Sequence, residues 1–135
     1  ETDIAIDHGE FARLAPEAVA QVVRIMRSEG MQATVSSIHV NGWYGAHDKL
    51  AGARWIVRER LGRALDAEVD RWAYVGDSTN DQRMFERFAS SIAVANIARF
   101  LPEITHPPRY LTRAERGAGF AEVAAAILAA RGIRN

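Results

Sequence analysis

The sequence lacks several features that would place a protein in a class at once. None of its 135 residues is cysteine, which excludes disulfides and thiolate metal sites and fits a reducing compartment such as the cytoplasm. Its 17 basic and 17 acidic residues cancel and form no run of one sign, so we expect no nucleic-acid partner and no membrane-surface partner. The longest apolar stretch, near residues 120–130, is too short to cross a bilayer.

Two further absences limit the chemistry that the sequence can support by itself. No Gly-x-Gly-x-x-Gly run follows a predicted strand, which argues against a nucleotide-binding doubly wound domain. No strand near the start ends in an Asp-x-Asp pair that could supply a nucleophilic carboxylate. Asp3 and Asp7 lie in the first expected strand, but they are not separated by a single residue. The sequence begins at Glu1 and enters a strand-like segment almost directly, so we expect it to be a piece of a longer protein.

The composition and the residue pattern are those of a folded α/β protein. Apolar residues make up 48% of the sequence and charged residues 25%, which excludes an intrinsically disordered chain. Strands alternate with helices after residue 46, and this order favours a parallel sheet. Asn41-Gly42 and Gly45 break the strand before them and mark a candidate hinge. The expected strands are 2–7, 32–40, 71–75, 91–95 and 110–112, and the expected helices are 16–29, 50–61, 81–88 and 120–130.

Apolar spacing also predicts which side chains are buried. In the first helix Val19, Val22, Val23 and Met26 form one stripe, and in the second Ala53, Ile56, Val57 and Leu61 form another. Trp55 and Trp72 are expected in the core. Three prolines, Pro102, Pro107 and Pro108, are expected to lie in loops.

The residues with the clearest chemical meaning follow the strand at 71–75. Gly76-Asp77 ends this apolar strand, and Asp81 opens the next helix after a short polar segment. Ligands of open α/β sheets bind at the carboxyl ends of the strands, and magnesium prefers oxygen ligands such as carboxylates. A second polar pair, Asp48-Lys49, opens the helix upstream. The combination predicts a magnesium and phosphate site.

These two segments resemble the third and fourth motifs of the haloacid dehalogenase (HAD) superfamily of phosphatases. The third motif is matched by Asp48-Lys49-Leu50-Ala51-Gly52-Ala53 and the fourth by Gly76-Asp77-Ser78-Thr79-Asn80-Asp81. Ser91-Ile92-Ala93-Val94-Ala95-Asn96 resembles the strand that follows the fourth motif. More narrowly, the sequence is similar to the C-terminal part of subfamily IIB, which includes Cof-like, sucrose-phosphate and mannosyl-phosphoglycerate phosphatases.

The resemblance implies a role for each matched residue. Asp77 resembles the carboxylate that binds magnesium, and Asp81 resembles a second acid that holds either the water shell of the metal or the lysine. Lys49 resembles the catalytic cation that contacts both the nucleophile and the phosphate. Asn80, together with Ser78, resembles the polar residues near the phosphoryl group. The expected substrate is a small phosphorylated metabolite, most simply a sugar phosphate, and the expected cofactor is Mg²⁺.

The same resemblance implies the fold and its division into domains. We expect a HAD-like Rossmannoid parallel sheet with helices on both faces, preceded by the tail of an α/β cap. Residues 1–45 would form the C-terminal part of the cap, and residues 46–135 the C-terminal half of the catalytic core. The nucleophilic Asp would lie outside the chain. The missing central strand would leave an apolar edge beside Val75, which we expect a homodimer or a missing N-terminal segment to cover.

Simpler interpretations stand beside these. Asp77 and Asp81 would then be a turn residue and a helix cap, and Lys49 a solvated surface lysine. His39 and His47 could be ligands but are more simply a strand-face and a loop histidine. The alternative function is a non-catalytic α/β module that binds phosphate or a partner. Trp43 and Tyr44 could line a cleft or simply pack, and Arg109, Arg113 and Arg116 are expected on a solvated face.

Overall fold

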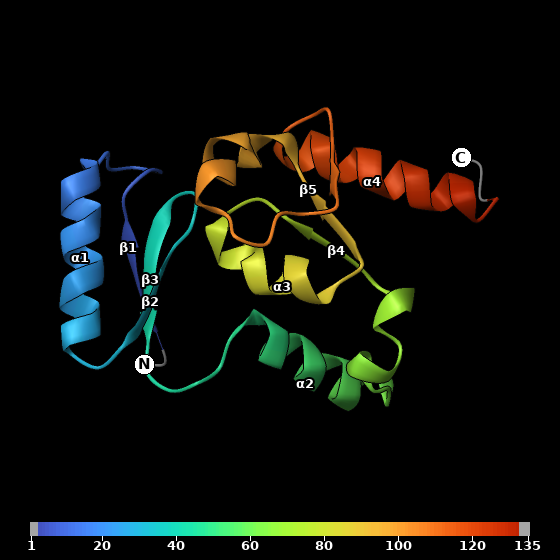
Figure 1. The fold of residues 1–135 in the computed structure, drawn as a ribbon, viewed down its shortest axis with the longest axis horizontal. Helices are drawn as coiled ribbons and strands as arrows, with labels where there is room; N and C mark the ends of the chain where they lie inside the picture. Colours follow the sequence, from blue (N-terminus) through green and yellow to red (C-terminus); the bar gives the residue numbers. More distant parts are fainter. Residues whose placement is uncertain (1–2, 133–135) are drawn as a thin grey trace. The chain divides into compact units, whose positions relative to one another are not determined.

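The computed structural model describes residues 3–132, so Thr2, which was expected in the first strand, lies outside the described residues. The chain divides into two compact units, Glu1–Asp48 and Lys49–Asn135 (Figure 1). The assignment of the first unit to a cap and of the second to a catalytic core stays a prediction. Within the described part of the chain, no helix combines the length and the apolar character needed to cross a membrane.

The first unit is a small antiparallel sheet with one helix packed against it (Figure 1). Its strands are β1 (Asp3–Asp7), β2 (Gln32–Val35) and β3 (His39–Trp43), in the order β1-β3-β2. The helix α1 (Pro16–Ser28) begins at a proline, which suits a first helical turn, and is followed by Gly30 at a left-handed φ of 79°. Val19, Val22, Val23 and Met26 pack onto the sheet around Val40, which is fully buried.

The expected single strand at 32–40 is wrong, because β2 and β3 form a hairpin. Ser36 closes the turn. Its N–H donates to the carbonyl oxygen of His39 (2.7 Å), and its Oγ accepts from the N–H of His39 (3.0 Å). Asn41 and Gly42 do not break a strand but lie inside β3. Gly42 packs closely against α1 there, since a Cβ atom would lie 2.7 Å from Met26 Sδ and the end of that side chain would have to move.

The second unit is a parallel sheet with helices, which confirms the predicted α/β class. Its strands run in the order β4-β5-β6, and both neighbouring pairs are parallel. The strands are β4 (Ala73–Gly76), β5 (Ser90–Ala93) and β6 (Tyr110–Leu111), and the helices are α2 (Lys49–Leu61), α3 (Gln82–Arg87) and α4 (Arg116–Ala130). Short 3₁₀ helices cover Leu65–Ala67, Val69–Arg71, Thr79–Asp81 and Ala95–Glu103. Pro102 therefore lies in a 3₁₀ helix and not in the predicted loop.

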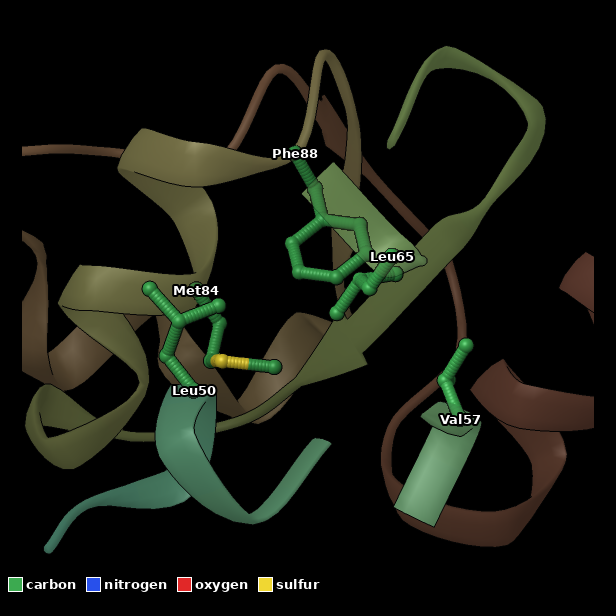
Figure 2. Close-up of a cluster of buried hydrophobic side chains, with 5 residues drawn as sticks. All are labelled: Leu50, Val57, Leu65, Met84 and Phe88. Carbon is green, nitrogen blue, oxygen red and sulfur yellow. The ribbon is translucent and has the colours of Figure 1, made fainter. Parts of the chain in front are cut away.

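The core of this unit joins α2 and α3 to β4. Its main cluster contains Leu50, Val57, Leu65, Met84 and Phe88 (Figure 2), with Trp72 and Tyr74 packed against it. The buried stripe of α2 runs through Leu50 and Val57, so three side chains that were expected in the core face outward. Trp55, Ile56 and Leu61 are each more than half exposed.

β4 is an edge strand in the part of the chain that the structure describes. Its pairing partner there is β5, which binds one of its two edges. Val75, which is half-buried, therefore stands on an edge strand, as predicted from the resemblance. What covers that edge stays a prediction.

Candidate metal and phosphate site

The carboxyl end of β4 brings two carboxylates together. Asp77 directly follows the strand, and the N–H of Val94 donates to Gly76 O (3.1 Å), which fixes the end of β4 beside β5. Ser78 then starts the 3₁₀ turn Thr79–Asp81, which leads into α3. Ser78 and Asp81 form a capping box in which each side chain accepts from the backbone N–H of the other. The segment is thus folded by its own hydrogen bonds.

Asp81 is the most heavily bonded side chain of the site, and only 2% of it is exposed. Its Oδ1 accepts from Lys49 Nζ (2.5 Å) and from the hydroxyl of Tyr74 (2.6 Å). Its Oδ2 accepts from the N–H groups of Asp77 (2.8 Å) and Ser78 (3.2 Å). Four donors occupy the roughly four lone-pair sites of a carboxylate. This arrangement favours a role in holding the lysine and the backbone over direct metal ligation.

The same contacts decide the charge of this carboxylate. Burial acts to raise the pKa of Asp81, but the hydrogen bonds from Lys49 and Tyr74 outweigh it and hold the pKa below its ordinary value. Burial and the neighbouring Asp81 carboxylate raise the pKa of Tyr74 well above its ordinary value. Asp81 is therefore charged and Tyr74 is a neutral donor at physiological pH.

Asp77 is bonded differently. Its carboxylate is half-buried, and Oδ2 accepts from Asn96 Nδ2 (3.2 Å). Among the described residues, no donor is bonded to Oδ1. Asn96 is held in turn, because its Oδ1 accepts from the N–H of Arg116 (3.0 Å). Asp77 Oδ1 is consequently the carboxylate oxygen of the site that can take a hard cation.

Lys49 supplies the positive charge of the site. It is the first residue of α2, its side chain is 49% exposed, and its ammonium lies against Asp81. Lys49 Nζ and Ser78 Oγ both donate to Asn80 Oδ1 (2.9 Å each), which turns the amide nitrogen of Asn80 away from these donors. The structure therefore brings all five predicted site residues together.

Composition gives Lys49 further weight. It is the only lysine in the sequence, so the other 16 of the 17 basic residues are arginine. It lies at a carboxylate and a candidate anion site, where the compact point charge of an ammonium differs from a planar guanidinium.

Sequence reasoning missed Tyr74 and gave Asn96 no role. Tyr74 lies in an otherwise apolar strand, two residues before Gly76, so the two residues are on the same face of β4. Asp81 folds back over this face and accepts from the Tyr74 hydroxyl. Its ring packs against Phe85 and Phe88, with centroids 5.9 and 5.7 Å away, so it connects the core to the site. A polar group inside an otherwise apolar strand was the available signal.

The other candidate residues lie in different segments of the chain. His39, His47, Trp43 and Tyr44 belong to the first unit, where Trp43 Nε1 donates to the carbonyl of His47 (2.9 Å). Arg109, Arg113 and Arg116 are exposed, as expected for a solvated face. In the part of the chain that the structure describes, no group of three or more histidine or acidic residues could hold a metal ion. An ion bound at Asp77 would keep water or take ligands from elsewhere.

Gly76 offers a test of the packing at the site. A Cβ atom at this position would lie 2.6 Å from Asp81 Oδ2, so Gly76→Ala should displace the Asp81 carboxylate and destabilise the fold by about 1–3 kcal/mol. Gly52→Ala is the matched control, because nothing lies within 4 Å of a Cβ atom there and alanine favours the helix. Thermal unfolding measures both. Equal stability of the two variants would contradict the observed packing.

Comparison with known proteins supports the fold. No protein-family model matches the chain, and no curated protein is similar enough in sequence to match it. Among solved structures, one similar chain is a Plasmodium vivax protein described as a putative HAD/COF-like hydrolase, with a TM-score of 0.65, 18% identity and coverage of 93% of this chain and 42% of that chain. A Thermoplasma acidophilum protein is similar with a TM-score of 0.64, 19% identity and coverage of 93% and 50%.

A third similar structure is a haloacid dehalogenase-like hydrolase from Bacteroides thetaiotaomicron, with a TM-score of 0.57, 16% identity and coverage of 93% of this chain and 44% of that chain. The fold of this chain is therefore that of HAD-like hydrolases. The chain spans half or less of the length of these structures.

Proposed function

We propose that the chain is part of a magnesium-dependent phosphatase that acts on a small phosphorylated metabolite, most simply a sugar phosphate. The observation that carries this proposal is the arrangement at the end of β4. There the Asp81 carboxylate holds the only lysine by a 2.5 Å contact, and the neighbouring Asp77 keeps one carboxylate oxygen without a described donor. The shared fold with HAD-like hydrolases supports it.

Magnesium fits the residues that are present. It binds oxygen ligands, takes only one or two carboxylates and keeps several waters, which suits a single available oxygen on Asp77 beside the saturated Asp81. When bound, the ion would supply positive charge to the phosphate oxygens and to the approaching nucleophile. Asp81 would act on the ion only through bound water or through Lys49.

The residues of the chain would prepare the site for an anion. The ammonium of Lys49 is fixed by Asp81 and Asn80, so it is positioned before the phosphate arrives. The Oδ1 of Asn80 already accepts two hydrogen bonds, and its amide nitrogen can donate to a phosphate oxygen. The nucleophile would be an Asp outside the chain, and its attack brings two anions together. Lys49 reduces that repulsion.

The test uses a longer protein that contains this chain. It should release phosphate from p-nitrophenyl phosphate or from a panel of sugar phosphates, and EDTA should stop the reaction. The purified 135-residue chain should release none, because it offers no in-line nucleophile. Turnover that persists in EDTA, or release of phosphate by the chain alone, would contradict the proposal. Binding of phosphate without turnover of any phosphomonoester would favour the non-catalytic module.

Lys49→Arg should fail to restore the activity that Lys49→Ala removes. A guanidinium is planar and longer, so it cannot place a point charge at both Asp81 Oδ1 and Asn80 Oδ1 as the ammonium does. Steady-state kinetics in the longer protein measure kcat for both variants. As a control, Arg58→Lys on the exposed part of α2 should leave kcat unchanged. Wild-type turnover by Lys49→Arg would remove Lys49 from the catalytic machinery.

A further inference from the structure

One amide connects the candidate metal carboxylate to the start of α4. Asn96 Nδ2 donates to Asp77 Oδ2 (3.2 Å), while Asn96 Oδ1 accepts from the N–H of Arg116 (3.0 Å). Asn96 lies in the 3₁₀ segment that follows β5, and Arg116 is the first residue of α4. The side chain of Asn96, which belongs to the segment after β5, thus links the end of β4 to the start of α4.

The backbone at Arg116 indicates that this connection is constrained. Its φ is 52°, and it is the only residue other than glycine with a positive φ in residues 3–132. An L-residue with a side chain pays conformational free energy for this geometry, which persists only where surrounding contacts impose it. The hydrogen bond that the Arg116 N–H donates to Asn96 Oδ1 is such a contact.

We propose that Asn96 is a positioning residue for Asp77. By holding Oδ2, it fixes the rotation of the carboxylate so that Oδ1 stays available to the ligand, and it couples Asp77 to the first turn of α4. This inference rests on the proposed function in one respect: it takes a divalent cation to be the ligand of Asp77 Oδ1. Asparagine suits the position because one amide both donates to a carboxylate and accepts from an N–H. Alanine can do neither.

A nearby side chain provides a matched control. Thr112 is buried, accepts from the N–H of Ala95 (3.2 Å) and donates to the carbonyl oxygen of Ala114 (2.6 Å). Thr112→Val therefore loosens the same region between β5 and α4 without removing a contact to Asp77. A purely structural role for Asn96 predicts that Asn96→Ala and Thr112→Val behave alike.

The first measurement is the affinity of the 135-residue chain for Mn²⁺, used as the probe cation and followed by electron paramagnetic resonance. Loss of a group that orients a metal ligand typically weakens binding about 10- to 100-fold, so Asn96→Ala should raise the Kd by at least the lower of these factors. Thr112→Val should keep the wild-type Kd even where it lowers the Tm. Unchanged affinity in Asn96→Ala, or equal losses in both variants, would overturn the proposal.

The second measurement needs no metal and separates this inference from the proposed function. In ¹⁵N-labelled chain, Asp77→Asn should shift the Arg116 amide resonance, because removal of the charge weakens the hydrogen bonds that pass through Asn96. In an Asn96→Ala background the same substitution should leave that resonance in place. If the chain binds no Mn²⁺ but the coupling is present, the metal role of Asp77 fails and the positioning role stands. If the Arg116 resonance does not respond, the positioning role fails.

Discussion

Asp77→Asn should lower the magnesium-dependent turnover of a longer protein containing this chain by roughly a thousand-fold or more. Metal neutralisation of phosphoryl transfer contributes several kcal/mol, and each 1.4 kcal/mol is about tenfold in rate. The substitution keeps the size of the side chain and can keep a contact to Asn96, since an amide oxygen still accepts from Nδ2. The expected loss therefore reports on charge and ligation.

The measurement is kcat at saturating magnesium, with the Tm as a check on folding. Asp70→Asn is the control, because Asp70 is an exposed carboxylate in the same unit and lies outside the site. Its turnover should equal that of the wild type. An Asp77→Asn enzyme that keeps its rate would show that Asp77 does not hold the catalytic cation.

Asp81→Ala should destabilise the second unit by about 3–5 kcal/mol, a large part of the stability of a small domain. The substitution removes the acceptor from Tyr74 OH and from the N–H groups of Asp77 and Ser78, and a buried donor without a partner is costly. Lys49 adds less to this loss, since half of its side chain is exposed and can be hydrated. Urea unfolding gives the free energy directly.

The same variant predicts a change in acid sensitivity. The pKa of Asp81 is lowered in the folded state, so its stabilising contribution is present above the unfolded-state pKa and is lost as the pH falls through the folded-state value. Asp81→Ala should therefore lose less stability on acidification than the wild type. Asp70→Ala should change stability by no more than about 0.5 kcal/mol. Equal stability of Asp81→Ala and Asp70→Ala would contradict the hydrogen-bond network described for Asp81.

The sequence predicted the parallel unit well because its signals are local. The apolar strand before Gly76, the helix that starts at Lys49 and the short strand at 110–111 all lie where residue patterns place them. The five candidate site residues come together for the same reason: they stand at a strand end and at the starts of helical segments, whose positions the sheet topology fixes.

The sequence failed where tertiary contacts determine the structure. Ser36-Ser37-Ile38 carries no glycine, proline or asparagine, and the turn depends on hydrogen bonds between Ser36 and His39. Gly42 was interpreted as a strand breaker, but it lies inside β3 and packs against the distant Met26. Trp55 was assigned to the core by its hydrophobicity, whereas it is 54% exposed because the core of α2 lies along another stripe.

The partners of the site residues also depended on contacts between distant segments. Local pattern can place Asp81 at a helix start, but it cannot show that Tyr74 and Lys49 share one of its oxygens. Nor can it show that Asn96 links Asp77 to Arg116. These contacts join residues that are up to 32 positions apart, and only the folded chain brings them together.

Titration of the ¹⁵N-labelled chain with Mg²⁺, followed by inorganic phosphate, is the most direct test of a cation site at Asp77 beside Lys49. Such a site predicts saturable shifts of the amide resonances of residues 76–81 with Mg²⁺, absent in Asp77→Asn. It also predicts that phosphate then perturbs the single Lys49 side chain, which can be observed without interference from any other lysine. Absence of Mg²⁺-dependent shifts at 76–81, or identical shifts in Asp77→Asn, would contradict it.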